Sequence, residues 1–375
     1  MNIRFWGTRG SVPAAGRGTQ RYGGNTSCVE LRAVDGALTV LDAGTGICML
    51  GATLPFDIER VDVLLSHLHM DHILGLGFFT GLFRPDLVVH LWGPGSTTQP
   101  LRARLTRYLS PPLFPVSLRD LPCRLELHDV PLGTFEIPGL AVTTALVCHP
   151  GPTVGYRLDD GRSTLAYLSD HEPALGARTF PDAAAWTSGF GLAEGVDVLV
   201  HDAQYTDEEY ALHVGWGHSA IRHAAAYAAH TGVRRLIAFH HDPWHDDEAL
   251  DGMYAARKAR EDALPHLEPG REIAHFQNRL AAYGVLRPRR WRLRHFERHR
   301  QAFARETAQC RYRSQERARI GVRRCIEDPL DRSLLDSLAV AHHHNAVRDL
   351  RHHAHVVGDE NEPHAELTLQ RGNQP

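Results

Sequence analysis

The chain has 375 residues, 43% of them hydrophobic, and a formal net charge of −3. It contains no apolar run near the roughly 18 residues that a membrane span needs, and its six cysteines form no Cys-x-x-Cys pair, which argues against a zinc ribbon and a disulfide framework. We therefore expect a cytoplasmic protein without a membrane partner and with room for more than one domain.

The first predicted elements are strands. Residues 2–7 are predicted to form a short strand, and residues 27–31 and 38–42 are predicted to pair as a hairpin through the Asp35-Gly36 turn. The apolar run at residues 61–65 then predicts a buried strand.

A run of metal-ligand residues follows directly, in the segment Ser66-His67-Leu68-His69-Met70-Asp71-His72. Packing alone would favour apolar side chains at such a place, whereas imidazoles and carboxylates bind metal. His67 and His69, two residues apart, can face one ion, while Asp71 and His72 lie past the bend and can serve a second. Chance clustering is the alternative, because the chain contains 26 histidines, but the order of the run and the strand before it favour two metals.

The order His-x-His-x-Asp-His after a strand resembles the signature of the metallo-β-lactamase fold superfamily. The resemblance implies a four-layer αββα sandwich and three further ligands, in the order His, Asp, His, each at the end of a later strand. The redox branch of that superfamily uses a Glu at the second His position, so His69 argues against that branch.

Two later strands supply the next matching residues. A strand predicted over residues 140–147 is followed by His149, which matches the third ligand of the first metal. A strand predicted over residues 163–169 delivers Asp170, whose two carboxylate oxygens are able to bridge both ions. Taken singly, each could be a polar strand end that faces water; their order after the ligand run favours the metal interpretation.

Two further loops indicate which branch of the superfamily the chain resembles. A strand predicted over residues 196–200 leads to His201-Asp202, and His218 precedes a helix with Ser219 as its expected N-cap and Gly232 as its end. This layout is similar to the tRNase Z and phosphodiesterase branch, where an acidic residue supports the histidine that stabilises the phosphoryl transition state or protonates the leaving oxygen. The resemblance gives these roles to Asp202 and His218. The alternative is that Asp202 caps a turn and His218 is a surface residue, and geometry decides between them.

The last ligand follows the strand predicted over residues 235–239, which runs into His240 and His241. The resemblance favours His240 as the final ligand of the second metal. On sequence alone, His241 remains a close alternative.

The predicted ligand set consists of imidazoles and carboxylates, which suit two divalent ions, Zn²⁺ first and Mn²⁺ or Fe²⁺ as alternatives. Two such ions about 3.5–4 Å apart can hold a bridging hydroxide that cleaves a phosphodiester by in-line displacement. Asp71 is expected to ligate the second ion and to orient this nucleophile, with His218 acting on the opposite side of phosphorus. Asp42 is expected to support the ligand loop without binding an ion.

The predicted substrate is small. Bacterial tRNase Z enzymes carry a long tRNA-binding arm between the third His and the bridging Asp, whereas only twenty residues separate His149 from Asp170. The resemblance therefore favours a cyclic or nucleotide-type diester. Residues 78–122 and 179–195 are predicted to be inserted loops that line the pocket or simply cover the surface.

The matched motifs end near residue 276, so we predict a catalytic domain over residues 1–276 and an extension over residues 277–375. Fourteen arginines lie between residues 287 and 324. Residues 290–320 are predicted to form an Arg-rich helix, followed by a disordered end. Nucleic acid is the less favoured partner, because Lys258 is the only lysine and a charge run is usually a solvated face. The helix could also contact a second subunit, which would make a homodimer.

Two other functions remain open from the sequence. One is a hydrolase of the same fold that cleaves a lactone or (thio)ester, against which the Asp202 and His218 loops argue. The other is a catalytically weak nucleic-acid-binding or regulatory protein that uses the Arg-rich extension.

Overall fold

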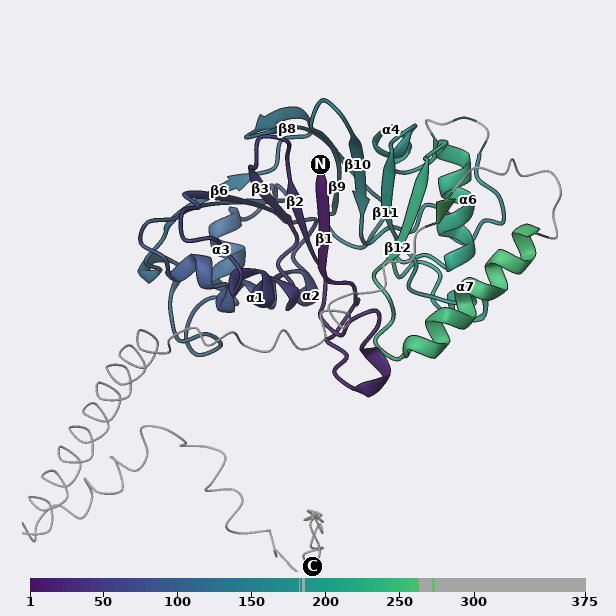
Figure 1. Cartoon of the computed structure of the whole chain (residues 1–375), viewed down its shortest axis with the longest axis horizontal. Helices are drawn as coiled ribbons and strands as arrows, with labels where there is room; N and C mark the ends of the chain where they lie inside the picture. The colour runs from purple at the N-terminus through teal and green to yellow at the C-terminus, as the bar shows by residue number, and fades with distance from the viewer. Residues whose placement is uncertain (182, 184–185, 263–271, 274–375) are drawn as a thin grey trace, which may run out of the picture. The chain divides into compact units, whose positions relative to one another are not determined.

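The computed structural model describes residues 1–181, 183, 186–262 and 272–273, in which two sheets are flanked by helices (Figure 1). The chain divides into two units, Met1–Gly284 and Val285–Pro375. The second unit, and with it the predictions of an Arg-rich helix and of a disordered end, lies outside the described residues. None of the described helices combines the length and the apolar character needed to cross a membrane.

The first sheet has six strands in the order β1-β2-β3-β4-β5-β6. β2 and β3 pair antiparallel, which confirms the predicted hairpin, and Gly36 adopts a left-handed conformation (φ +87°) at its turn. β4 is parallel to both of its neighbours, and a central strand of this kind is covered on both faces, which explains its apolar run. The strands are β1 (Asn2–Gly7), β2 (Cys28–Arg32), β3 (Leu38–Leu41), β4 (Arg60–Leu64), β5 (Val88–Gly93) and β6 (Arg124–Asp129).

The second sheet has seven strands in the order β13-β12-β11-β10-β9-β8-β7. β10, β11 and β12 are parallel, so their carboxyl ends meet at one edge, where Asp170, Asp202 and His240 lie at or just beyond the strand ends. The strands are β7 (Gly133–Ile137), β8 (Leu140–Leu146), β9 (Val154–Asp159), β10 (Thr164–Leu168), β11 (Val198–Asp202), β12 (Arg235–Phe239) and β13 (Glu272–Ile273).

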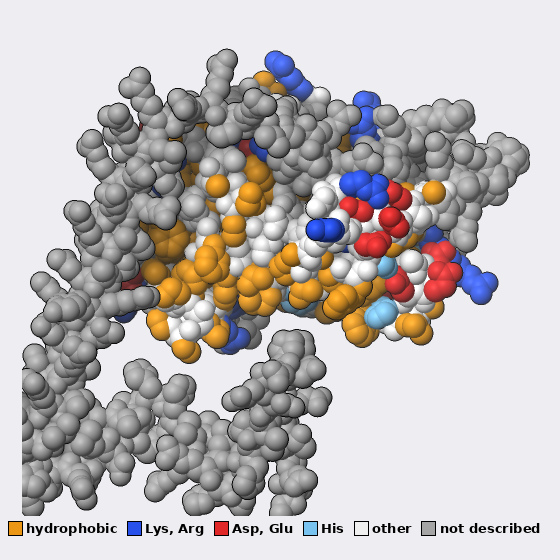
Figure 2. All heavy atoms as spheres, turned by 60° about the horizontal axis from the view of Figure 1, so that its bottom comes forward, with side chains coloured by type: hydrophobic (Ala, Val, Ile, Leu, Met, Phe, Trp, Pro, Cys, Tyr) orange, Lys and Arg blue, Asp and Glu red, His pale blue; other side chains and the backbone are white. Residues whose placement is uncertain are grey.

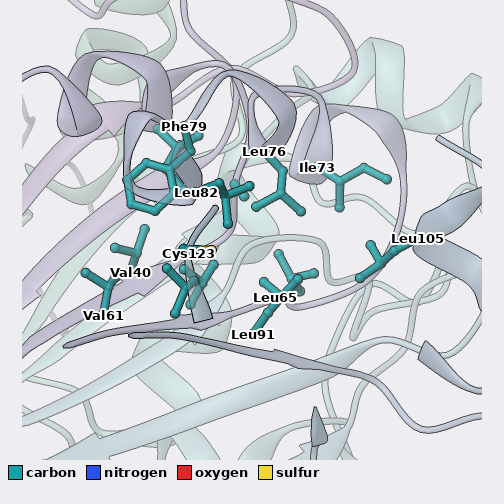
Figure 3. Packing of buried hydrophobic residues seen from close by; sticks show 14 of the residues in the cluster. Val40, Val61, Leu65, Ile73, Leu76, Phe79, Leu82, Leu91, Leu105 and Cys123 are labelled. Atoms are coloured by element: carbon teal, nitrogen blue, oxygen red, sulfur yellow. The ribbon is translucent and has the colours of Figure 1, made fainter. Parts of the chain in front are cut away.

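Three hydrophobic clusters hold the layers together. One lies between the sheets and joins Leu64 of β4 to Tyr156 of β9. The second packs helical turns, including Phe79, against Val61 on the outer face of the first sheet (Figure 3). The third packs helices against the second sheet through residues such as Leu199. The resulting order of helix, sheet, sheet and helix is the predicted αββα sandwich.

The α-helices are mostly short. They are α1 (Gly46–Gly51), α2 (Met70–Ile73), α3 (Leu101–Thr106), α4 (Phe190–Ala193), α5 (Asp207–Leu212), α6 (Ile221–Thr231) and α7 (Asp247–Asp262), and 3₁₀ turns form η1 (Arg17–Thr19), η2 (Leu76–Phe78), η3 (Thr80–Phe83) and η4 (Leu118–Asp120). Helices α1 and α3 pack on the first sheet, and α4 and α6 pack on the second (Figure 1).

Two local predictions were wrong. Ser219 does not cap α6: the N-cap is Ala220, and the Ser219 hydroxyl donates to the His171 carbonyl at 2.7 Å. The expected end of α6 is correct, since Gly232 follows in a left-handed conformation (φ 72°). Residues 78–122 are not a plain loop, because β5 and α3 form there. β5 lies in the first sheet between β4 and β6.

Candidate metal centre

Three histidines from separate elements form a first ligand group. His67 and His69 follow β4, and His149 follows β8; one ring nitrogen of each lies within 4.8 Å of the others. The His149 Nε2 atom is 3.3 Å from His69 Nδ1, which is about the separation of two imidazole nitrogens on one tetrahedral zinc ion. The His149 Nδ1–H donates to the Gly217 carbonyl at 2.9 Å. This bond orients the ring and leaves Nε2 for a metal.

A second group consists of Asp71, His72, Asp170 and His240, all of them buried. The Nε2 atom of His240 is 3.1 Å from Asp71 Oδ2 and 3.2 Å from Asp170 Oδ1. The Nε2 atom of His72 is 3.1 Å from Asp170 Oδ2. The structure therefore brings together the four residues that the sequence assigned to the second metal.

Asp170 lies between the two groups. Its Oδ1 atom is 3.8 Å from His67 Nε2 of the first group, and its Oδ2 atom faces His72 of the second. His67 Nε2 is buried and has no hydrogen-bond partner among the described residues. A buried polar atom without a partner costs free energy, and a cation between His67 and Asp170 would satisfy it. The residues present thus fit a metal.

The structure separates His240 from His241. His240 has a left-handed backbone (φ 58°), its Nδ1–H donates to Gln204 Oε1 at 2.9 Å, and its Nε2 faces the carboxylates. His241 instead packs between Tyr22 and Tyr254. Positive φ costs about 1–3 kcal/mol for a non-glycine residue and tends to persist at functional sites. His240 is therefore the histidine at the centre.

The protonation of the first group suits metal binding. Burial lowers the pKa of His67 well below its usual range and also lowers the pKa values of His69 and His149. All three imidazoles are then neutral near pH 7, which is the form that coordinates a metal.

The second group concentrates negative charge. Burial opposes ionisation of both Asp71 and Asp170, but the neighbouring histidines outweigh it and hold the two carboxyl pKa values below their usual range. Burial also opposes a charge on His240, yet Asp170 and Asp71 raise its pKa to about 9. Without a metal, the carboxylates are thus neutralised by protonated histidines. A divalent cation would replace these protons.

Asp42 supports the second group, as predicted for a residue that binds no ion itself. Its carboxylate is fully buried and accepts hydrogen bonds from the Ser66 amide at 2.7 Å, His72 Nδ1 at 2.7 Å and the Tyr167 hydroxyl at 2.8 Å. The bond from Nδ1 leaves the His72 Nε2 atom for the metal and fixes the ring orientation.

We expect Asp42→Asn to lower metal affinity about 10- to 100-fold, the usual effect of removing an outer partner of a ligand. The Ser66 amide donates to Oδ1 and His72 Nδ1 donates to Oδ2, so the new N–H₂ group must face one of these two donors whichever way the side-chain amide turns. Metal content after dialysis against graded chelator tests this. Asp35→Asn, in the exposed β2–β3 turn, is the control. A folded Asp42→Asn protein with wild-type affinity would contradict the role of Asp42.

Asp202 and His218 lie beside the second group. The His218 Nδ1–H donates to Asp202 Oδ2 at 2.7 Å, so aspartate reaches the histidine although it is shorter than glutamate by one methylene. The His218 ring stacks on His240, with centroids 4.9 Å apart, and its Nδ1 is 3.9 Å from Asp170 Oδ1. Asp202 also accepts from the Ser219 amide at 2.8 Å. It therefore both shapes the loop and fixes the tautomer of His218.

Several partners of the centre were not predicted from the sequence, among them Gln204, Ser66 and Tyr167. Gln204 accepts from His240, and Ser66 and Tyr167 donate to Asp42. Gln204 and Ser66 gave a weak signal, because both adjoin residues of the strand-end motifs. Tyr167 gave none, since a tyrosine in a strand is usually explained by packing.

Comparisons with known proteins show the family of this chain. Residues 39–241 match the family described as "Beta-lactamase superfamily domain". Ribonuclease Z of Gemmatimonas aurantiaca is 27% identical over 300 residues, which cover 70% of this chain and 92% of that protein. Ribonuclease BN of Escherichia coli is 26% identical over 325 residues, which cover 74% of this chain and 99% of that protein.

Two solved structures have the same fold. The metallo-beta-lactamase fold protein YhfI from Bacillus subtilis superimposes with a TM-score of 0.51 at 16% identity, covering 73% of this chain and 95% of that chain. Zn(2+)-bound PqqB from Methylobacterium extorquens does so with a TM-score of 0.51 at 20% identity, covering 74% and 98%.

Proposed function

The chain belongs to the beta-lactamase superfamily, and from this premise we propose that it hydrolyses a small phosphodiester at a centre of two divalent metal ions. It is a metallo-β-lactamase-fold hydrolase of the tRNase Z branch. Metal-dependent cleavage of a phosphodiester is the reaction class of that branch. The number of metals, their identity, the residues that bind them and the substrate are our proposals.

The observation that carries the proposal is the His218–Asp202 pair beside the two ligand groups. We assign His67, His69 and His149 to one ion, Asp71, His72 and His240 to the other, and Asp170 to both. Zn²⁺ is the preferred metal, because neutral imidazoles and carboxylates without a thiolate suit it, with Mn²⁺ or Fe²⁺ as alternatives. Two such ions, when bound, supply an activated water and neutralise charge on the phosphoryl oxygens.

The protein's own residues perform the remaining steps. Asp71 accepts a hydrogen bond from the Ser11 amide at 2.7 Å, which restrains the carboxylate, and we propose that Asp71 orients the attacking water. Asp202 fixes the tautomer of His218 by binding its Nδ1–H. The other ring nitrogen, Nε2, then acts on the leaving oxygen or on the phosphoryl group. A histidine held in this tautomer is placed to transfer a proton through its other ring nitrogen.

The chain between His149 and Asp170 supports a small substrate, because β9 and β10 form an antiparallel pair there. Trp216, adjacent to Gly217 of the centre, is 60% exposed and could stack on a base. On the face shown in Figure 2, hydrophobic side chains spread widely and Asp and Glu gather on one side. The described side chains of that face form no continuous basic strip of the kind that holds a nucleic-acid backbone.

RNA is the second candidate substrate, favoured by the names of the relatives, ribonuclease Z and ribonuclease BN, which this chain matches over most of their length. The Arg-rich extension would then provide the phosphate contacts.

Turnover of metal-loaded protein on three substrates tests the proposal: bis-p-nitrophenyl phosphate, 2′,3′-cyclic nucleotides and an RNA with a 3′ extension. We expect cleavage of the first two and little cleavage of the RNA. Absence of diesterase activity at full metal content would refute the proposal, and turnover of a lactone or thioester alone would favour the esterase alternative. Truncation after residue 286 is the control: loss of RNA cleavage with retained diesterase activity would assign RNA binding to the extension.

A further inference from the structure

Glu172 is a buried carboxylate next to the metal centre. The mechanism proposed above gives this residue no role. Glu172 lies two residues after Asp170 and is 0% exposed. Its Oε1 atom accepts from the Tyr210 hydroxyl at 2.8 Å and from the Gly215 amide at 2.9 Å, and its Oε2 atom accepts from the Gly217 amide at 2.8 Å. All of these donors are neutral. They belong to α5 and to the segment that follows it.

Burying a carboxylate is costly unless strong hydrogen bonds replace its water. Bonds from backbone amides to an ionised carboxylate are strong, and two such amides, Gly215 and Gly217, come from the same turn. Both glycines have left-handed backbones, with φ +87° and φ +90°. A Cβ on Gly217 would lie only 2.3 Å from His149 Nδ1. The turn is therefore bonded to Glu172 at both glycines, and Gly217 packs closely against His149.

This turn contacts His149 of the first ligand group and also contains His218, which lies beside the second group. The Gly217 carbonyl accepts from His149 Nδ1 at 2.9 Å, and the next residue is His218, which donates to Asp202. The amide and the carbonyl of Gly217 thus connect Glu172 to a histidine of the first ligand group. A shift of the turn would move the hydrogen-bond partner of His149 and the backbone of His218 together.

We propose that Glu172 is a positioning residue that fixes this turn, and through it sets the ring of His149 and the place of His218. Its effect on the rate rests on the proposed function, whereas its effect on His149 does not. Glu172 touches neither substrate nor metal in this proposal.

The test uses Glu172→Gln in the full-length, metal-loaded protein. The amide of glutamine has one acceptor oxygen, so its N–H₂ group must face Tyr210 or a backbone N–H of the turn. We expect kcat to fall about 10- to 100-fold, with KM little changed. This is the usual range for residues that orient a metal ligand without binding the metal themselves. Tyr210→Phe is the matched control: it removes the bond from Tyr210 to Glu172 and the bond that Tyr210 accepts from the Gly176 amide, but it keeps both glycine bonds to Glu172, so its loss should be clearly smaller. Equal losses in the two variants would contradict the proposal.

A double-mutant cycle separates positioning from general destabilisation. In a His218→Ala background, Glu172→Gln should cost much less in kcat than in the wild type, because part of its effect passes through His218. Full additivity would remove this part of the proposal. If Glu172→Gln does not fold, Glu172→Asp keeps the buried charge but withdraws its oxygens by one methylene, and wild-type turnover in that variant would overturn the proposal.

The visible absorption spectrum of Co²⁺-substituted protein supplies a readout independent of activity. Glu172→Gln should change this spectrum, since the His149 ring loses its fixed partner, whereas Tyr210→Phe should change it less. The spectrum tests Glu172 even if the wild-type protein cleaves no diester. An unchanged spectrum together with unchanged turnover would refute the proposal for Glu172 alone.

Discussion

Replacing His69 with alanine is expected to remove metal from the first ligand group and to lower kcat/KM for a phosphodiester by about 10³-fold or more. A metal acting on phosphoryl oxygens is worth several kcal/mol in the transition state, and each 1.36 kcal/mol is tenfold in rate. His69 and His149 place ring nitrogens 3.3 Å apart, so loss of either opens the group. Elemental analysis of the purified variant, beside its turnover, measures both effects.

His69 is a suitable ligand to remove because it is the exposed member of its group. Its replacement should leave the free energy of unfolding of the metal-free protein within about 0.5 kcal/mol of the wild-type value, as for most surface substitutions. His230→Ala is the control, since His230 lies on α6 and in none of the groups of described residues that could hold a metal, and it should keep metal and rate. A His69→Ala protein with full metal content and full turnover would remove His69 from the ligand set.

Replacing His218 with alanine is expected to keep the metal and to lower kcat about 10²- to 10⁴-fold, the usual contribution of general acid–base catalysis. The His218 ring lies beside His240 and its Nδ1 is bound to Asp202, so it is adjacent to the ligands without being needed to complete either group. Retention of metal by elemental analysis, combined with the loss of rate, distinguishes this role from that of His69. A retained rate would exclude His218 from the mechanism.

The choice of substrate separates the two roles proposed for His218. p-Nitrophenolate departs without a proton, whereas the ribose oxygen of a 2′,3′-cyclic nucleotide needs one. If His218 protonates the leaving oxygen, the loss on the cyclic nucleotide should be much larger than on bis-p-nitrophenyl phosphate. Equal losses would assign it to charge stabilisation at phosphorus. Asp202→Asn should reproduce part of the same pattern, because the tautomer of His218 is then no longer fixed.

Most strands that bear the centre could be predicted from sequence. β12 begins and ends at the predicted residues, and β4, β8, β10 and β11 lie within two residues of their predicted limits. The apolar, β-branched runs of β4, β10 and β11 come from burial on both faces, and their length of five residues favours strands over helices. β5 was missed: its alternating burial, with His90 and Trp92 on one face, leaves no continuous apolar run.

The sequence by itself determined the ligand run at residues 67–72 and the family that this run resembles. It also determined the order along the chain in which the later ligand residues follow. These are local properties, since residue type and strand position are written along the chain. Only the tertiary structure decided that His240 and not His241 faces the carboxylates, that Asp202 reaches His218, and that Ser219 bonds to His171 instead of capping α6. Each depends on a backbone angle or a distance between segments far apart in sequence, which no local pattern specifies.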